Sequence, residues 1–403
     1  MNERNGTLRS TISLEEAADG VWDALVIGAG PAGTMIAREV AQRSARILLV
    51  DRAQFPRRKV CGCCFNAAAL HILRAVGLGT LPDRLGARPL RTLQLIAGKR
   101  SASIRLPDTL ALSRDLFDAA LVEQAINRGV EWLSPASAML GAVERSARSV
   151  TLAHDGHQAA VRARVVIVAS GLSGGIAPPD NRDAVHVEPE SRVGLGTVID
   201  SSTNACPSDA IVMICGIGGY VGMVKLPGGG LNVAAALDPA FIRRLRGPAA
   251  AVQSLFDETG VSRIGEIETC AWRGTAALSR RRIRISAERL FVICDAAGYV
   301  EPFTGEGIAW ALASGVAAAP LAMAAAHRWA PALETQWVRL YRRLIEPRQR
   351  ACWLMAHALR RRGLTRTVVS ILSCMPSAAA PLTRRMTTPF RQLPHPTLRV
   401  VVE

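Results

Sequence analysis

Three glycines near the start of the chain, Gly28, Gly30 and Gly33, have the spacing of a loop that binds the phosphates of a nucleotide. The first permits a tight turn, the second lets the backbone approach a pyrophosphate, and the third allows close packing of a helix on a strand. Asp51 lies roughly 20 residues further on, where a carboxylate can hydrogen-bond an adenosine ribose. The pattern therefore predicts a dinucleotide site at the N-terminus of a helix, whose dipole favours an anion.

The elements that would position this loop can be read on either side of it. Residues 22–27 predict a buried strand, 34–43 a helix and 47–50 a second buried strand. This order is typical of a parallel, doubly wound sheet. A second glycine cluster, 216–219, is followed by another strand instead of a helix, so we interpret it as a hairpin turn. We expect one dinucleotide-binding unit, with residues 1–20 as a mobile leader.

Cysteine is the next residue type with reactive chemistry. Cys61, Cys63 and Cys64 lie close together, but no second Cys/His pair completes a zinc site, so we expect no metal. The nine cysteines are scattered, and no apolar signal segment precedes them. This usage predicts free thiols and a cytoplasmic protein.

Composition and charge limit the class of protein. The chain has 403 residues, of which 49% are hydrophobic and 20% charged, as in a globular protein of two or three domains. Its formal charge is +16, and all but three of its 49 cations, Lys59, Lys99 and Lys225, are arginine. Two interpretations stay open: an anionic partner, or an arginine-rich codon composition.

Four ordered motifs follow the glycine loop: 51–62 (DRAQFPRRKVCG), 113–121 (SRDLFDAAL), 166–171 (VIVASG) and 291–308 (FVICDAAGYVEPFTGEGI). With the loop, they resemble the geranylgeranyl reductase family. That family belongs to a wider group of FAD-dependent oxidoreductases, which includes the para-hydroxybenzoate hydroxylase type monooxygenases. The resemblance covers about residues 20–325 and implies FAD as the cofactor.

The resemblance also assigns roles to individual residues. The three glycines would hold the FAD pyrophosphate, Asp51 the ribose, and Asp295 the ribityl–pyrophosphate part. Residues 302–308 would form the turn against the flavin ring and stabilise negative charge on it. The implied cofactor-binding residues are Gly28, Gly30, Gly33, Asp51, Arg52, Arg114, Asp295, Gly305 and Gly307.

Two residues are candidates for catalysis. Cys61 occupies the family's Lys-x-Cys-Gly position, which the resemblance places near the flavin and substrate. A thiol there could protonate a substrate carbon, line the pocket, or act as a small hydrophobe. Tyr220 begins a run that resembles the family's substrate-sheet strand, although the expected Trp is missing, so it either faces the substrate or packs in the core.

Two departures from the family pattern bear on the cofactors. Ser170 stands where the family has Asp, in a motif tied to both FAD and NADPH handling in the monooxygenases. NAD(P)H is therefore a candidate electron donor that the motif does not support directly. Cys294 stands where the family has Gly, and its side chain adds bulk where the backbone lies close to the cofactor.

The strand pattern and the resemblance together predict an α/β fold of three parts. A discontinuous Rossmann-like FAD-binding domain is expected from residues 20–79, 111–175 and 286–328. A mostly antiparallel β-sheet substrate domain is expected from 80–110 and 176–285, with a helix across 241–259. Residues 329–403 are expected to form a basic C-terminal helical region.

The leading functional hypothesis is hydride transfer from reduced FAD to a C=C bond of a bulky hydrophobic substrate, isoprenoid or polyketide-like. A single-component FAD-dependent aromatic monooxygenase on the same fold is the alternative. A flavin-free binding protein is a third hypothesis, from a different class, and the substitutions Ser170 and Cys294 motivate it. The Trp-x-Trp-x-Ile-Pro segment that flavin halogenases carry is absent, which argues against halogenation.

The C-terminal region accounts for much of the basic charge. Residues 339–391 contain twelve arginines and one acid, Glu346, beside Trp353 and several aliphatic residues. Such a region suits peripheral contact with an anionic membrane, and it equally suits a solvated helical cap. We expect no nucleic acid, because no recognition motif accompanies the charge. Residues 308–326 are uncharged, and we interpret them as a buried helix rather than a membrane span.

Overall fold

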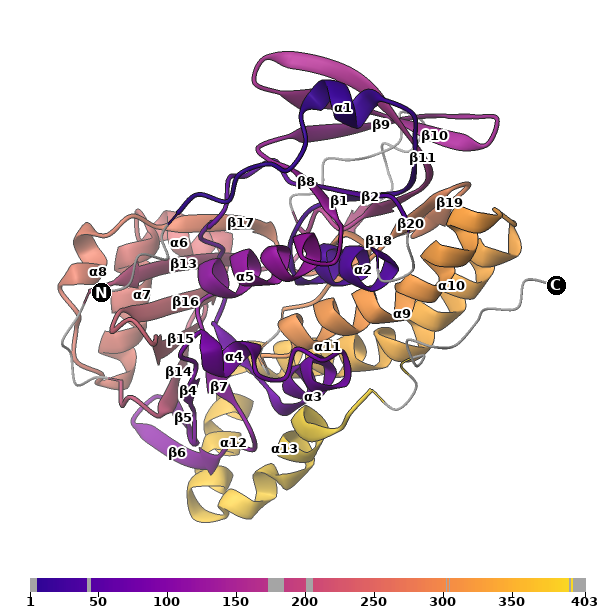
Figure 1. The fold of residues 1–403 in the computed structure, drawn as a ribbon. Helices are drawn as coiled ribbons and strands as arrows, with labels where there is room; N and C mark the ends of the chain where they lie inside the picture. Colours follow the sequence, from indigo (N-terminus) through magenta and orange to yellow (C-terminus); the bar gives the residue numbers. More distant parts are fainter. Residues whose placement is uncertain are drawn as a thin grey trace.

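The computed structural model is described for most of the chain (Figure 1). The described residues are 6–41, 45–172, 185–200, 206–301, 303, 305–390 and 393. Among them, two large sheets and a C-terminal set of helices confirm the predicted α/β class.

The first sheet carries the glycine loop. Its main path runs β19 (Ser286–Ala287), β20 (Leu290–Val292), β11 (His157–Val168), β1 (Val21–Ile27), β2 (Ile47–Val50) and β8 (Glu131–Leu133). From β20 to β8 the neighbours pair in parallel, so their carboxyl ends share one edge. β9 (Ser137–Glu144) and β10 (Ala147–His154) extend β11 as an antiparallel hairpin arm. Ligands bind at such a carboxyl edge in open α/β sheets.

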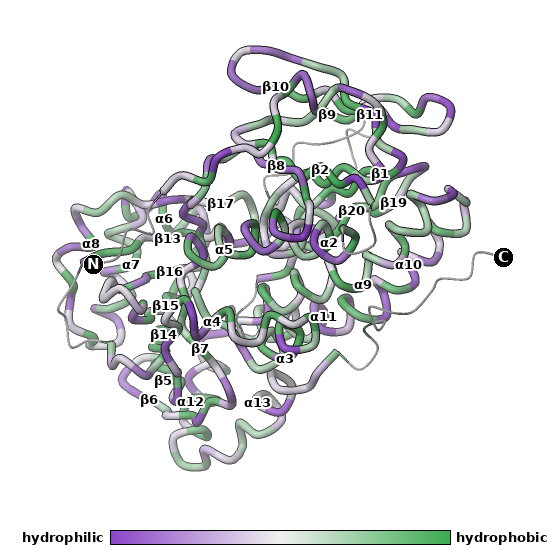
Figure 2. Tube along the Cα trace, in the orientation of Figure 1, coloured by the Kyte–Doolittle hydropathy of each residue, from purple (hydrophilic) through white to green (hydrophobic). Residues whose placement is uncertain are grey.

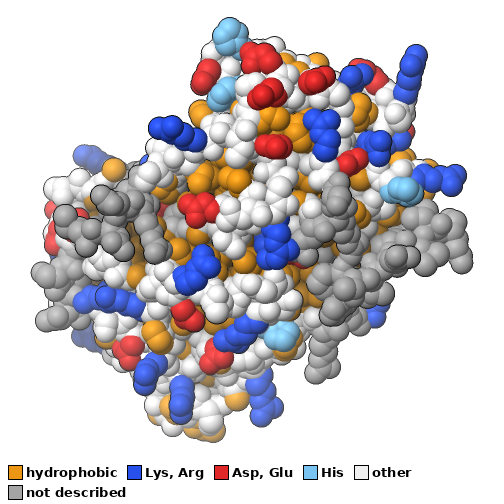
Figure 3. Space-filling model, viewed as in Figure 1, with side chains coloured by type: hydrophobic (Ala, Val, Ile, Leu, Met, Phe, Trp, Pro, Cys, Tyr) orange, Lys and Arg blue, Asp and Glu red, His pale blue; other side chains and the backbone are white. Residues whose placement is uncertain are grey.

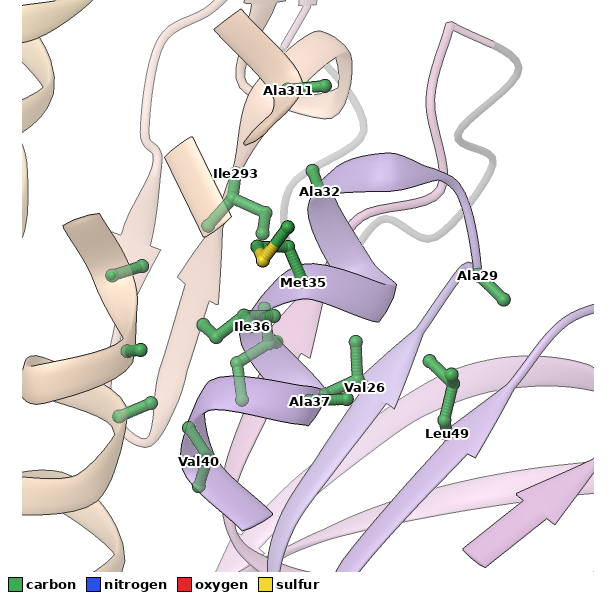
Figure 4. Close-up of a cluster of buried hydrophobic side chains, with 14 of the residues drawn as sticks. Val26, Ala29, Ala32, Met35, Ile36, Ala37, Val40, Leu49, Ile293 and Ala311 are labelled. Carbon is green, nitrogen blue, oxygen red and sulfur yellow. The ribbon is translucent and has the colours of Figure 1, made fainter. Parts of the chain in front are cut away.

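Helix α2 (Pro31–Ala41) lies buried along its whole length between this sheet and α9 (Gly307–His327). Figure 4 shows Met35 and Ile36 of α2 packed among side chains of the strands and of the α9 segment. A Cβ on Gly315 would lie 2.6 Å from the Ala32 carbonyl oxygen, so the two helices approach closely only because this residue is glycine. The hydrophobic residues concentrate in these central strands and helices (Figure 2).

The second sheet has the order β17 (Arg273–Ala277), β13 (Val193–Ile199), β16 (Leu231–Leu237), β15 (Gly219–Lys225), β14 (Ala210–Gly216), β5 (Thr92–Ala97) and β6 (Arg100–Arg105). All its pairs are antiparallel except β5 with β14. The glycine cluster at 216–219 is the β14–β15 hairpin turn, as predicted. One face of the sheet packs on α6 (Pro239–Arg244), α7 (Pro248–Thr259) and α8 (Glu266–Thr269).

Two sequence expectations about local structure were wrong. The helix expected across 241–259 is broken between α6 and α7, because Arg246 and Gly247 have positive φ and Pro248 begins a new helix. The described part of the leader is packed on the first sheet: the Thr11 amide donates to the Trp132 carbonyl, and α1 (Leu14–Ala18) buries Leu14.

Short elements connect the two sheets. The helices are α3 (Ala67–Ala75), α4 (Leu81–Arg84) and α5 (Arg114–Ile126), and the 3₁₀ turn η1 (Cys294–Ala296) follows β20. β7 (Leu110–Ala111) pairs with β3 (Cys64–Phe65) and β4 (Arg88–Pro89). β18 (Arg280–Arg282) pairs with β12 (Val185–Val187) and β21 (Gly298–Tyr299).

The C-terminal region forms α10 (Ala332–Leu344), α11 (Glu346–Arg360), α12 (Arg362–Cys374), the 3₁₀ turn η2 (Pro376–Ala379) and α13 (Ala380–Thr387). α12 lies beside β5 and β6 at the foot of the molecule in Figure 1, where its Val369 and Leu372 join the core of that sheet. One helix among the described residues, α9, is long and apolar enough to cross a membrane by length and composition, and 89% of its apolar window is buried in the protein.

Candidate active site

The glycine loop joins β1 to α2 and uses its three glycines differently. A Cβ on Gly28, whose φ is 105°, would lie 2.5 Å from the Ala169 carbonyl oxygen, and a Cβ on Gly33 would lie 1.9 Å from the Gly28 carbonyl oxygen. Both residues are therefore glycine because the protein itself fills the space. Within the described part of the chain, a Cβ on Gly30 would meet only the Arg57 guanidinium, at 3.9 Å. Gly30 thus faces the open side of the loop, at the N-terminus of α2.

Asp51, at the carboxyl end of β2, is hydrogen-bonded to this loop. Its two oxygens accept from the backbone amides of Ala29, at 2.8 Å, and Ala53, at 2.9 Å. The Arg57 guanidinium lies 3.6 Å from the same carboxylate. Asp51 therefore holds the loop against β2, while Arg52 beside it is exposed.

A buried carboxylate, Asp118, organises the cations next to the loop. Arg114 forms two hydrogen bonds of 2.8 Å with it, and Arg57 contributes a third of 3.2 Å. Asp118 has no exposed surface, so its charge requires these partners. The sequence had singled out Arg114 but missed Arg57 and Asp118; the signal was the basic run that begins at Arg57.

Cys61 lies beside this cationic cluster. Its sulfur accepts a hydrogen bond from the Cys63 backbone amide at 3.4 Å. Hydrogen bonding from Cys63, together with the charge of Arg114, lowers the pKa of the Cys61 thiol to about 6 although burial opposes the shift. Such a thiol is mostly ionised at neutral pH, so it is a better nucleophile than proton donor. A catalytic role for Cys61 stays a prediction, and proton donation is the less favoured form of it.

The segment around Cys61 is attached to both halves of the molecule. The Asn232 side-chain amide of β16 donates to the Cys61 carbonyl oxygen at 3.0 Å. A Cβ on Gly196 of β13 would lie 3.2 Å from Val60 Cγ1, so Val60 packs directly on that strand. A Cβ on Gly305 would lie 3.9 Å from Cys64 Cβ. The cysteines therefore lie between the second sheet and the turn that precedes α9.

That turn, which we call the 301–307 turn, contains two buried acids. Pro302 and Thr304 lie outside the described residues. Glu301 is fully buried and accepts a hydrogen bond of 2.9 Å from Arg192, at the start of β13. Glu306 is also fully buried and accepts one of 2.8 Å from Arg348 of α11.

Sequence reasoning assigned no role at this site to these four charged residues. The available signal was the presence of two acids within an otherwise apolar motif, since buried acids need cations. Gly305, with φ of 70°, and Gly307, the first residue of α9, complete the turn.

Tyr220 reaches this turn from β15. Its ring packs edge-on against Phe303, with ring centroids 5.0 Å apart, and the Arg192 guanidinium lies 5.8 Å from the ring. Burial, reinforced by the nearby Glu301 charge, raises the pKa of the Tyr220 hydroxyl, so it stays protonated. Of the two alternatives from the sequence, Tyr220 is packed in the core beside the 301–307 turn, and a substrate-facing role for it stays a prediction.

The two departures from the family pattern lie at the ends of β11 and β20. The Ser170 hydroxyl is buried without a hydrogen-bond partner among the described residues. Cys294 has a left-handed φ of 54°, and its thiol donates to Asp295 Oδ1 at 3.1 Å. Burial raises the pKa of Asp295. A narrow hollow is lined by Gly171, Arg280 and Asp295.

These features fit FAD along the carboxyl edge of the first sheet. The open side of Gly30 suits a pyrophosphate, the unpartnered Ser170 hydroxyl is free for a ligand, and Arg57 and Arg114 provide positive charge. The structure brings together Gly28, Gly30, Gly33 and Asp51 as one group, and Cys61, Arg114 and Gly305 as a second. No group of three or more potential metal ligands occurs within the described residues.

Comparison with known proteins agrees with this geometry. The FAD binding domain family model matches residues 22–210. Digeranylgeranylglycerophospholipid reductase 3 of Methanosphaera stadtmanae is 26% identical over 320 residues, which cover 74% of this chain and 77% of the relative.

Solved structures show the same fold. A geranylgeranyl bacteriochlorophyll reductase-like protein of Thermoplasma acidophilum has a TM-score of 0.75 at 18% identity, covering 92% of this chain and 96% of its own. The flavin-dependent brominase Bmp2 has a TM-score of 0.76 at 16% identity, covering 94% and 96%.

The different roles of the glycines can be separated by substitution. Gly33→Ala should destabilise the flavin-free protein by about 1–3 kcal/mol, because its methyl group overlaps the Gly28 carbonyl. Gly30→Ala should leave stability within about 0.5 kcal/mol of wild type and weaken FAD binding, because its methyl enters the open side of the loop. Thermal unfolding and FAD titration measure the two effects, and wild-type FAD affinity in Gly30→Ala would contradict this assignment.

Cys294 gives a second test. Cys294→Gly should raise the free energy of unfolding of the flavin-free protein by about 1–2 kcal/mol, because it removes left-handed strain. It should also tighten FAD binding several-fold, because it removes the side-chain bulk and releases Asp295 from the thiol. Cys294→Ala is the matched control, since it loses the thiol and keeps the Cβ. Equal FAD affinity in the two variants would show that the Cβ does not hinder the cofactor.

Proposed function

We propose that this chain, an FAD-dependent oxidoreductase of the geranylgeranyl reductase-like family, reduces a C=C bond of a bulky hydrophobic molecule, isoprenoid or polyketide-like. FAD, when bound, would supply the hydride. The observation that supports this most is an apolar sheet face that meets the 301–307 turn, through the contact of Tyr220 with Phe303.

The composition of this face suits a large apolar substrate. Gly196, Ala234 and Gly222 are register neighbours on β13, β16 and β15, and Met213 continues the row on β14. They share the face with Tyr220, because alternate residues of a strand point to the same side. Val60 packs over Gly196, and the Met213 sulfur lies 2.9 Å from where a Cβ on Gly222 would be, so apolar atoms cover these small residues. An apolar wall of this kind favours contact with a lipid-like molecule.

Reduction of a C=C bond also needs a proton, and the local charges favour Tyr220 over Cys61 as its source. The Tyr220 hydroxyl is protonated at neutral pH, whereas the Cys61 thiol is mostly ionised. Burial and the Glu301 charge make this hydroxyl a weak acid, and Arg192, near the Tyr220 ring, would partly offset them by stabilising the phenolate left after proton transfer. The role of Cys61 is then to contribute negative charge or a nucleophile next to Arg114.

Anaerobic reoxidation tests the proposed reaction. Photoreduced holoprotein should be reoxidised by a geranylgeranyl lipid without oxygen, and Tyr220→Phe should slow this step by roughly 10²-fold, the usual contribution of a general acid. The FAD affinity of the variant should match wild type. Parallel reduction by NADPH and NADH identifies the donor.

The outcomes separate the two reactions. Reoxidation by oxygen alone, with labelled oxygen incorporated into the product, would replace reduction by the aromatic monooxygenase reaction. Reoxidation by the lipid at the wild-type rate in Tyr220→Phe would remove Tyr220 as the proton donor.

A lipid-like substrate would reside in a membrane. We therefore propose peripheral contact of the protein with an anionic membrane, through α12. Its Leu364, Val368 and Ile371 are each exposed by 41–50% and lie on one helix face. The structure also reduces the available charge: six C-terminal arginines pair with acids, namely Arg342, Arg348, Arg350, Arg360, Arg362 and Arg366. On the face in Figure 3, basic side chains lie scattered among acidic ones rather than in one continuous patch.

Co-sedimentation with liposomes tests this contact. Val368→Ser with Ile371→Ser should reduce binding to anionic liposomes, because the apolar stripe is removed. Ile283→Ser, a single substitution of the same kind at a residue exposed by 69% outside α12, should leave binding unchanged. Binding that is indifferent to lipid charge, or equally weakened by Ile283→Ser, would contradict membrane contact through α12.

A further inference from the structure

Three cysteines lie where the candidate flavin site meets the second sheet. Cys61 and Cys64 are partly exposed, while Cys63 is buried. Cys64 lies next to Gly305 of the 301–307 turn, and Asn232 of β16 contacts both Cys61 and Cys63. Neither binding of FAD nor the proposed reduction requires more than one thiol at this place.

The backbone folds Cys61 and Cys63 toward each other. Cys63 has a left-handed φ of 56°, an uncommon conformation for a residue with a side chain. Its amide donates to the Cys61 sulfur at 3.4 Å, and its thiol donates to Asn232 Oδ1 at 3.6 Å, on the same side chain that binds the Cys61 carbonyl. The Cys64 thiol instead donates to the Gly62 carbonyl at 3.1 Å.

The electrostatics differ between the two sulfurs. Arg114 and the hydrogen bonds from Cys63 favour the thiolate of Cys61. The neighbouring Cys61 sulfur and burial raise the pKa of the Cys63 thiol, which keeps its proton. An ionised sulfur beside a protonated one is the arrangement of an attacking thiolate with a resolving thiol.

We propose that Cys61 and Cys63 form a peroxide-sensitive dithiol, in which Cys61 is the site of oxidation and Cys63 resolves it. The Cys61 thiolate attacks hydrogen peroxide, so that an S–O bond forms, the O–O bond breaks, and hydroxide takes up a proton as water. The Cys63 sulfur then attacks the Cys61 sulfenic acid. An S–S bond forms, a second water leaves, and the two cysteines have together lost two electrons to one peroxide.

The position of the dithiol beside the candidate flavin site explains both the source of the oxidant and the effect of the disulfide. Reduced flavin exposed to oxygen produces hydrogen peroxide, so a flavin site generates the oxidant next to the thiol. Disulfide formation would remove the Cys61 thiolate from Arg114 and alter the segment that contacts Gly305. The dithiol would therefore sense uncoupled turnover at its source.

Alkylation of the FAD-loaded protein tests whether Cys61 is the reactive, ionised thiol. With iodoacetamide at pH 6, Cys61 should react about tenfold faster than Cys374, an exposed thiol elsewhere in the chain. The rate for Cys61 should level off above a midpoint near pH 6. Equal rates for the two cysteines at pH 6, or a Cys61 rate without a midpoint near pH 6, would overturn the proposal.

Peroxide treatment followed by peptide mass spectrometry tests whether Cys63 forms a disulfide with oxidised Cys61. Wild-type holoprotein should lose two hydrogens from the peptide with Cys61 and Cys63 and regain them with dithiothreitol. Cys63→Ser should instead accumulate a Cys61 sulfenic acid that dimedone traps, and Cys64→Ser should behave as wild type.

Three results would refute the dithiol: an intact Cys61 after peroxide, a disulfide through Cys64, or no dimedone adduct in Cys63→Ser. These readouts need no substrate, so they remain decisive whichever reaction the enzyme catalyses.

Discussion

Two buried carboxylates hold the candidate flavin site in place. Glu301 and Glu306 lie at either end of the 301–307 turn, and each has no exposed surface. Each binds an arginine from a distant part of the chain, Arg192 at the start of the second sheet and Arg348 on α11. Removing one partner of such a buried pair leaves an uncompensated charge at a cost of about 3–5 kcal/mol. The turn is therefore fixed relative to both the sheet and the C-terminal helices.

This network also connects the second sheet to the surface. Arg192 contacts Asp238, which follows β16, and Asp238 in turn binds Arg360 of α11. The C-terminal helices are thus part of the ion-pair structure around the site rather than a separate basic appendage. Four of the arginines that the sequence offered for a membrane bind acids in other parts of the protein, namely Arg348, Arg360, Arg362 and Arg366.

The sequence predicted those features that depend on neighbouring residues. The glycine loop, the strands on either side of it and the 216–219 hairpin turn follow from local spacing, and the structure has them. The pairs Glu301–Arg192 and Glu306–Arg348 could not be predicted, because each joins residues that only the tertiary fold brings together. The break at Arg246 and Gly247 was missed for another reason, since the apolar pattern continues across it.

The central claim is that FAD binds along the carboxyl edge of the first sheet with its ring against the 301–307 turn. A crystal structure of the FAD-loaded protein tests this most directly. The account predicts the pyrophosphate at the open side of Gly30 and the ring between the turn and the Cys61–Cys64 segment, on the side of Tyr220. A flavin ring that contacts neither the turn nor the cysteine segment would contradict it.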